Sequence, residues 1–193
     1  MKIRARARKV IEKDAKRDNR KKNIETIVWG PTQIPEGFIL MVDTREQLPL
    51  FDPIPRGLCI VRDTVPVGDY SILGFQDRIC VERKMESDFF TYIGRDRDAT
   101  VRKLERMAAM DFAALVVEAD EYDLYNPSVP TKMTREHVRG FMRCVRVRYG
   151  IHLYCNSSHS EVERYVLDSL AYAYEKIRGD VLIGKANGRT PAA

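Results

Sequence analysis

Apolar positions along the chain recur at two spacings, one typical of strands and one typical of helices. Six short runs have the continuous or alternating apolar pattern of strands, at residues 38–42, 58–61, 70–73, 78–82, 112–117 and 151–154. The run at 112–117 is the most apolar, and we expect it to form a central strand. Turn residues from Gly74 to Asp77 join two of the strand patterns and predict a hairpin there.

Helical spacing dominates the second half of the chain. We expect four helices: one capped by Ser87 or Asp88 and running through Ile93, one from Arg97 to Met110, one from Thr134 to Tyr149, and one that opens at a Ser158–Glu161 capping box and ends at Gly179. In the second helix Val101, Leu104 and Ala108 share a face, which we expect to be buried. Early strands followed by alternating helix and strand predict an α/β fold with a central mixed β-sheet flanked by helices.

Glycine and proline between residues 30 and 37 separate a basic N-terminal segment from the folded part. We expect an arm and linker over residues 1–35, a folded domain with a C-terminal helix over 36–180, and a flexible tail over 181–193. The first 22 residues hold eleven Lys or Arg and three acids, against 33 and 28 in the whole chain. Such an arm either follows nucleic-acid phosphates through counterion release or serves as solvated surface, and charge alone does not separate the two.

The composition, 44% hydrophobic and 32% charged, is typical of a folded protein in water. No apolar run approaches the length of a bilayer span, and the charged N-terminus lacks the apolar core of a secretory signal. We therefore expect an intracellular protein. The four cysteines, Cys59, Cys80, Cys144 and Cys155, lack the short spacing of a zinc site, so we expect free thiols.

Acidic residues stand at the ends of three predicted strands. Asp43 follows one apolar run, Asp69 opens another directly after Gly68, and Glu82 closes a third. A carboxylate at the end of a buried strand is costly to desolvate unless a cation or hydrogen bonds compensate it. One such residue is typical of an ordinary strand end, whereas three in neighbouring strands indicate a metal site of oxygen ligands.

Lys84 adds a positive charge beside this acidic set. Side chains alternate along a strand, so Glu82 and Lys84 project from the same face and Arg83 from the other. A cation that activates water and an ammonium group that holds the nucleophile are what phosphodiester hydrolysis requires. Taken alone, however, the Glu82–Lys84 pair is more typical of a surface Glu–Lys ladder.

The order of these residues resembles the GD…ERKxxxD signature of the XPF-type structure-specific nucleases, a branch of the restriction-endonuclease-like PD-(D/E)xK superfamily. The signature here reads Gly68-Asp69, then Glu82-Arg83-Lys84 and Asp88, and residues 42–46, Val-Asp-Thr-Arg-Glu, are similar to the upstream V-D-x-R-E element. The order of elements matches over roughly residues 38–155. A lone ERK is weak, whereas the ordered combination is specific.

The resemblance implies a divalent-metal-dependent endonuclease that hydrolyses DNA phosphodiester bonds with Mg²⁺ or Mn²⁺. It implies catalytic roles for Asp43, Asp69, Glu82 and Lys84. The three acids would be metal ligands, and Lys84 would orient the attacking water or help to deprotonate it.

The remaining motif positions and two basic stripes complete the expected site. Glu46 would bind the metal or support its ligands, Arg83 would contact phosphate or serve the structure, and Asp88 would cap the following helix. For DNA contacts we expect one basic stripe made of Arg95, Arg102, Lys103 and Arg106. A second arc of arginines is formed by Arg135, Arg139, Arg143 and Arg146. For each stripe the solvated outer face of a packed helix is an equally good interpretation.

The resemblance further implies branched or flapped DNA in repair, recombination or replication as the substrate, and a homodimer or heterodimer as the assembly. Members of that family commonly carry tandem helix-hairpin-helix modules after the nuclease domain, whereas residues 156–193 predict one long helix. Two alternatives stay open: a restriction- or resolvase-like nuclease, and a catalytically inactive DNA-binding scaffold. The scaffold fits less well because the full acidic set is present.

Overall fold

The computed structural model describes residues 28–29, 32–128 and 130–186, with side chains from 34 to 128 and from 130 to 179. The N-terminal arm over residues 1–27 and the last part of the tail, 187–193, lie outside the described residues. Within the predicted linker, the short strands β1 (Val28–Trp29) and β2 (Thr32–Gln33) pair antiparallel.

A six-stranded mixed sheet forms the centre of the domain. Its strands, in sheet order, are β4 (Ile60–Asp63), β3 (Leu40–Asp43), β5 (Tyr70–Ile72), β6 (Ile79–Met85), β7 (Phe112–Glu118) and β8 (His152–Cys155). The pairs β3–β4, β6–β7 and β7–β8 are parallel, whereas β5 runs antiparallel to both of its neighbours. All six predicted strands are therefore present, and the predicted hairpin is the β5–β6 pair.

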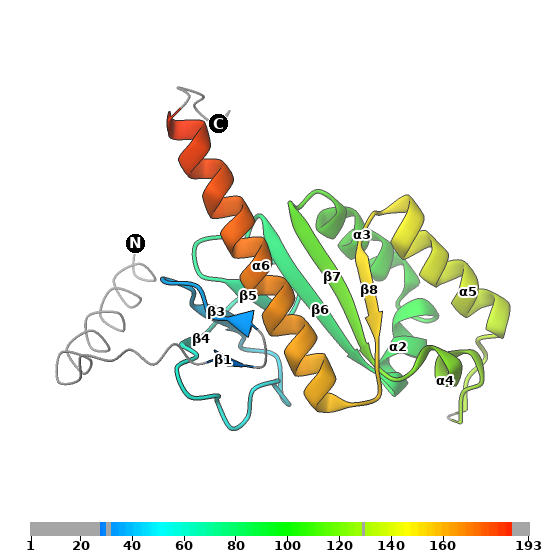
Figure 1. Cartoon of the computed structure of the whole chain (residues 1–193). Helices are drawn as coiled ribbons and strands as arrows, with labels where there is room; N and C mark the ends of the chain where they lie inside the picture. The colour runs from blue at the N-terminus through cyan, green and yellow to red at the C-terminus, as the bar shows by residue number, and fades with distance from the viewer. Residues whose placement is uncertain (1–27, 30–31, 129, 187–193) are drawn as a thin grey trace.

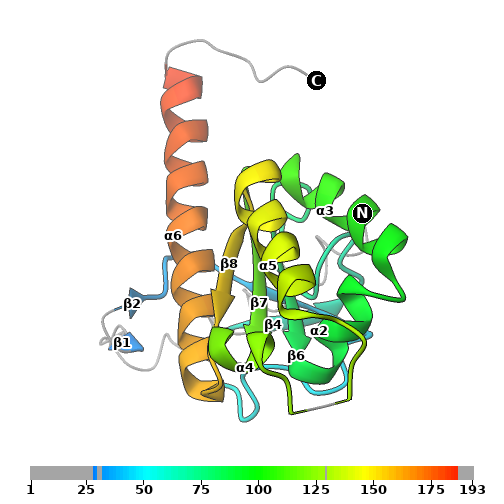
Figure 2. The same ribbon diagram turned by 90° about the vertical axis from the view of Figure 1, so that its right-hand side faces the viewer.

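Helices cover the two faces of the sheet separately (Figures 1 and 2). The long helix α6 (His159–Ala186) packs on one face through a core that includes Val81, Val116 and Val166. The other face carries α2 (Glu86–Ile93), α3 (Arg97–Ala108) and α5 (Arg135–Arg143), and the short α4 (Glu121–Tyr125) follows β7. This arrangement confirms the predicted α/β fold with a central mixed sheet flanked by helices.

Two of the expected helix details are wrong at the residue level. Helix α2 begins at Glu86 with Met85 at its N-cap, so Ser87 and Asp88 lie in the first turn and do not cap it. The reason is that α2 follows β6 directly, without the loop that a capping residue would need. In α3 the buried residues are Thr100, Leu104 and Met107, whereas Val101 is partly buried and Ala108 is exposed.

Two helix ends also differ from expectation. The predicted helix over residues 134–149 is α-helical only to Arg143 and continues as a π-helical turn over Cys144–Arg148. Helix α6 does not stop at Gly179 but continues to Ala186, and its C-terminal part projects beyond the sheet (Figure 2). A glycine inside a helix costs only about 1 kcal/mol relative to alanine, which a long helix can absorb.

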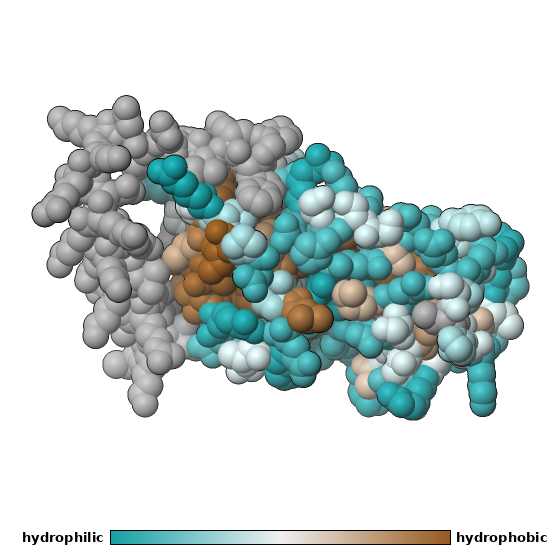
Figure 3. All heavy atoms as spheres, turned by 90° about the horizontal axis from the view of Figure 1, so that it is seen from below, coloured by the Kyte–Doolittle hydropathy of each residue, from teal (hydrophilic) through white to brown (hydrophobic). Residues whose placement is uncertain are grey.

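The surface is mainly hydrophilic on the face seen from below, where apolar residues gather in one region (Figure 3). No disulfide bond joins any of the four cysteines, all of which lie among the described residues. Among the described residues, no helix has the length and apolar character that crossing a membrane would require.

Candidate active site

Gly68 fixes the position of Asp69 at the start of β5. Its φ of +83° favours glycine, and a Cβ there would lie 2.7 Å from the Val81 carbonyl oxygen of β6. This close approach lets the Asp69 amide donate to the Val81 carbonyl at 2.8 Å. The Asp69 carbonyl in turn accepts from the Asp43 amide at 2.8 Å, so Asp69 lies between the ends of β3 and β6.

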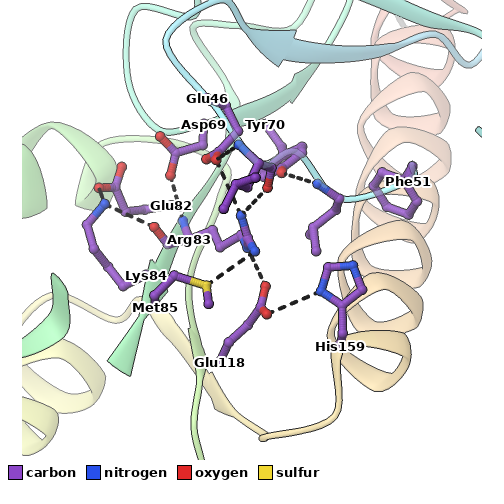
Figure 4. A network of polar contacts seen from close by, with 12 residues as sticks. Glu46, Phe51, Asp69, Tyr70, Glu82, Arg83, Lys84, Met85, Glu118 and His159 are labelled. Carbon is purple, nitrogen blue, oxygen red and sulfur yellow. Dashed lines mark hydrogen bonds and ion pairs between the residues drawn. The ribbon is translucent and has the colours of Figure 1, made fainter. Parts of the chain in front are cut away.

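Strand β6 places Glu82 and Lys84 on one face and Arg83 on the other, as the alternation predicts. Glu82 is fully buried, on the side of the sheet covered by α2 and α3. Figure 4 shows Asp69, Glu82 and Lys84 on one side of the strand, while the Arg83 guanidinium points away toward Glu118 and His159. The structure therefore brings three of the four predicted catalytic residues together.

Two lysines share one oxygen of Glu82. Lys84 Nζ and Lys103 Nζ each lie 2.7 Å from Glu82 Oε1, and Lys84 Nζ also donates to the Arg83 carbonyl at 2.9 Å. Both ammonium groups lie over the ring of Tyr92, at 5.3 and 5.9 Å from its centroid. The other oxygen, Glu82 Oε2, is buried and has no hydrogen-bond partner among the described residues.

Asp69 and Glu82 repel one another electrostatically. Burial raises the pKa of Asp69 to about 7, the negative charge of Glu82 adds to the rise, and Lys84 opposes it. A further positive charge at this point would favour the ionised form of Asp69. These two carboxylates are thus the residues that could hold a divalent cation, since Mg²⁺ and Mn²⁺ prefer such oxygen ligands.

Lys84 remains an ammonium group in this environment. Burial by itself would lower its pKa, but Glu82 and Asp69 outweigh burial and raise the pKa above its ordinary value, with a smaller contribution from Asp88. An ammonium group that keeps its proton is better suited to orient a water molecule than to deprotonate it. Asp88, wrongly predicted as a helix cap, lies in the first turn of α2 and acts on Lys84 through its charge.

Asp43 is directed to different partners from those of Asp69 and Glu82. Its Oδ1 accepts from Arg45 N and Nε at 2.8 and 2.7 Å, and its Oδ2 accepts from Arg45 Nη2 and Val65 N at 2.9 and 2.8 Å. The hydrogen bond from Arg45 lowers the pKa of Asp43 to about 2. Within the described ranges no group of three or more His, Cys, Asp or Glu is placed to hold a metal ion. Asp43 as a third ligand therefore stays a prediction.

Arg83 organises a buried network on the opposite face of β6. Its guanidinium pairs with Glu118 at the end of β7, lies 3.3 Å from Glu46 Oε1, and donates to the Leu48 carbonyl at 2.6 Å. Glu118 Oε2 lies 3.2 Å from His159 Nδ1 in the first turn of α6 (Figure 4). These contacts favour the structural role for Arg83, and they place Glu46 as its partner.

The four residues of the predicted DNA-binding stripe have different surroundings in the structure. Arg95 precedes α3 and is exposed, Arg102 is exposed on α3, and Arg106 donates to the Pro66 carbonyl at 2.9 Å. Lys103 alone turns into the candidate site. In the second arc, Arg139 and Arg146 pair with Glu136 and Glu121, which favours a solvated helix face. DNA contacts of either set stay predictions.

The sequence analysis did not predict the positions of Lys103 and Glu118 in the site. Lys103 was expected to contact DNA, and nothing in its spacing indicated a contact with Glu82. Glu118 was not singled out, although it closes an apolar strand as Glu82 does. That shared feature was a usable signal.

An acidic pair and a lysine at the ends of adjacent strands of a mixed sheet define a restriction-endonuclease-like α/β domain. The family model of the ERCC4 domain matches residues 42–168, and the chain belongs to this family. It is therefore an XPF-type nuclease domain by sequence and fold, which confirms the resemblance seen in the motifs.

Solved structures of XPF from Aeropyrum pernix are similar to this chain. One is 26% identical, with a TM-score of 0.54, over 69% of this chain and 59% of that one. Another, in complex with DNA, is 26% identical, with a TM-score of 0.51, over 72% of this chain and 66% of that one. The chain thus spans less than two thirds of either structure. No curated protein sequence matches it.

Proposed function

We propose that this chain is a divalent-metal-dependent endonuclease that hydrolyses DNA phosphodiester bonds. The observation that carries the proposal is the pair of neighbouring carboxylates beside two lysines, in which Glu82 is fully buried and Asp69 is partly buried. Such an acidic pair is electrostatically costly in isolation, and such costs are concentrated at functional sites. The family and the similarity to XPF in complex with DNA support the same proposal.

The donor set fits Mg²⁺ or Mn²⁺. Glu82 Oε2 is buried without a hydrogen-bond partner in the described part of the chain, and the pKa of Asp69 is raised to about 7. A cation held by Asp69 and Glu82 would relieve both costs. When bound, a divalent ion would lower the pKa of a water molecule and stabilise the negative charge that develops on the phosphoryl group.

The protein residues supply positioning and charge. Lys84, anchored by Glu82 and the Arg83 carbonyl, would hold the attacking water by an ammonium group that stays protonated. The Arg83 network keeps the ends of β6 and β7 in place beneath the site. Asp43 would join the metal ligands only if Arg45 gave up its hydrogen bonds to that carboxylate.

The proposed substrate is branched or flapped DNA, as in repair, recombination or replication. One of the similar XPF structures is a complex with DNA, and this chain offers Arg95, Arg102, Lys103 and Arg106 on and beside α3 for phosphate contacts. A restriction- or resolvase-like nuclease would instead cut plain duplex or four-way junctions with equal or greater efficiency. A homodimer or heterodimer is part of the same proposal and would appear in sedimentation of the protein with and without DNA.

A catalytically inactive scaffold is the second candidate. It would bind DNA through the same basic residues without needing two neighbouring carboxylates. Two neighbouring carboxylates cost electrostatic free energy, and DNA binding alone does not offset that cost. The presence of Asp69 and Glu82 together with Lys84 therefore favours the enzyme.

The test is cleavage of a panel of flap, splayed-arm, four-way and duplex DNA in Mg²⁺ or Mn²⁺. We expect the wild type to cut a branched substrate fastest and Asp69→Asn and Lys84→Ala to lose at least about a hundredfold in rate. Asp98→Asn, on the exposed part of α3, serves as the control and should retain activity. A folded wild type that binds the DNA and cuts none of it would establish the scaffold.

A further inference from the structure

The two lysines at Glu82 differ in how firmly they are held. Lys84 Nζ has two partners, Glu82 and the Arg83 carbonyl, and its side chain is 19% exposed. Lys103 comes from α3, a separate element, and its side chain is 36% exposed. In the described part of the chain, Glu82 is the one hydrogen-bond acceptor of Lys103. Lys103 is therefore the ammonium group that is easier to move.

The backbone beneath Lys103 is well anchored, so the freedom lies in the side chain. The next residue, Leu104, and Met107 pack into the core between α3 and the sheet. Thr100 donates to the Tyr92 carbonyl at 2.6 Å, which ties the start of α3 to α2. The Tyr92 ring lies against both ammonium groups and allows Lys103 to shift along it while keeping a favourable cation–π contact.

Binding of the proposed cation would bring more positive charge to a site that already holds two lysines. Without a metal ion, Lys84 and Lys103 are the cations that face the two carboxylates: both contact Glu82, and the charges of both act on Asp69. A divalent cation on the same carboxylates adds two positive charges close to both lysines. A phosphodiester brings negative charge to the site, and the more mobile ammonium group is the one able to turn toward it.

We propose that Lys103 is a substrate-binding residue that exchanges Glu82 for a phosphate oxygen of the DNA when the cation occupies the carboxylates. This inference rests on the proposed function and deepens it. Lys103 competes electrostatically with the metal for the Glu82 carboxylate and then cooperates with it in holding the phosphate. Lys84 keeps its place because the Arg83 carbonyl holds it independently of Glu82.

The exchange and a purely structural role for Lys103 predict different effects when the charge of Lys103 is removed. Removing the charge of Lys103 takes a competing cation from Glu82, so metal affinity increases. The same change removes a phosphate contact, so DNA affinity decreases. A purely structural lysine, on being lost, would weaken metal binding or leave it unchanged.

The experiment uses the full chain and the Lys103→Met variant, which keeps the length of the side chain. Calorimetry with Mn²⁺ alone should show binding about three- to tenfold tighter than in the wild type. DNA titrations across salt concentrations should show an affinity lower by about tenfold and a salt slope smaller by about one. Lys103→Arg should restore most of the DNA affinity, because it keeps the charge.

Lys176→Met, an exposed lysine of α6, is the matched control and should change neither measurement. The inference is overturned if Lys103→Met binds Mn²⁺ no more tightly than the wild type, or if its DNA affinity and salt slope are unchanged. Both readouts are equilibrium measurements that do not need cleavage. A wild type that cuts no substrate would therefore refute the proposed function without obscuring this result.

Discussion

At the scale of single residues, the site concentrates unfavourable electrostatics in one place. Burial and the charge of Glu82 raise the pKa of Asp69 to about 7, while Asp43, one strand away, has its pKa lowered to about 2 by Arg45. Two aspartates at neighbouring strand ends thus have opposite environments. The difference marks Asp69 as the aspartate whose ionised form a bound cation would stabilise most.

The raised pKa of Asp69 makes a pH-dependent prediction for stability. The neutral form is favoured in the folded protein, so this group contributes stability that is present below about pH 4 and lost as pH rises through about 7. Asp69→Asn cannot ionise and avoids that loss. We compare the melting temperatures of Asp69→Asn and the wild type in buffer with a chelator. The difference, variant minus wild type, should be several degrees larger at pH 8 than at pH 5. An equal difference at both pH values would contradict the burial of this carboxylate.

Gly68 offers a second residue-scale prediction. Alanine there would combine an unfavourable φ of +83° with a contact of 2.7 Å to the Val81 carbonyl, so Gly68→Ala should destabilise the fold by about 3 kcal/mol. Gly74, with φ of +90° and no heavy atom within 4 Å of the added Cβ, is the matched control and should lose about 1 kcal/mol. Urea unfolding measures both. Similar losses would show that the backbone approach at Gly68 is unimportant.

At the scale of elements, β6 serves two purposes because its side chains alternate. One face presents Glu82 and Lys84 to the site, and the other sends Arg83 into a network that reaches β7 and α6. The alternation was readable from the sequence, and so was the strand itself. The other members of this network were not, because Glu46, Glu118 and His159 are separated by tens of residues and only the sheet order brings them together.

Because the Arg83–Glu118 pair is buried, breaking the pair should lower the free energy of unfolding by a large amount. The side chains are 5% and 7% exposed, so Arg83→Met should leave a buried carboxylate without its cation and cost about 3–5 kcal/mol. Arg78–Asp111 is a comparable pair at 34% and 47% exposure, and Arg78→Met should cost about 0–1 kcal/mol. Urea unfolding of the two variants compares them directly. A loss of less than about 1 kcal/mol for Arg83→Met would mean that the network does not hold the strand ends.

Element boundaries were the part of the fold that local pattern predicted least well. The capping residues expected for α2 fall inside its first turn because the helix follows β6 without a loop. The glycine expected to end α6 lies within it, because one glycine costs a long helix only about 1 kcal/mol. Apolar periodicity identifies that an element exists, whereas its end depends on the connection to the next element and on the cost of single residues.

At the scale of the whole molecule, the motif residues meet because β5 and β6 form a hairpin beside β3. The sequence supported the sheet and the grouping of Asp69, Glu82 and Lys84, since all three stand at strand ends. It did not indicate that Arg45 engages both oxygens of Asp43, or that Lys103 reaches Glu82. Both depend on side-chain directions that only the assembled fold determines.

The basic N-terminal segment gives a prediction at this scale, although its residues lie outside those described. Residues 1–22 carry eight more positive than negative charges, so deleting them should lower DNA affinity and reduce the dependence of affinity on salt. Titration of DNA at several salt concentrations measures both effects. Unchanged affinity and slope would assign the segment to solvated surface.

The central claim is that Asp69 and Glu82 together hold a divalent cation, and Mn²⁺ binding to Glu82→Gln tests it most directly. Calorimetry on the wild type should show a Mn²⁺ site that Glu82→Gln weakens by at least about tenfold. Glu105→Gln, an exposed acid on α3, should bind as the wild type does. Equal Mn²⁺ affinity in all three folded proteins would contradict the account.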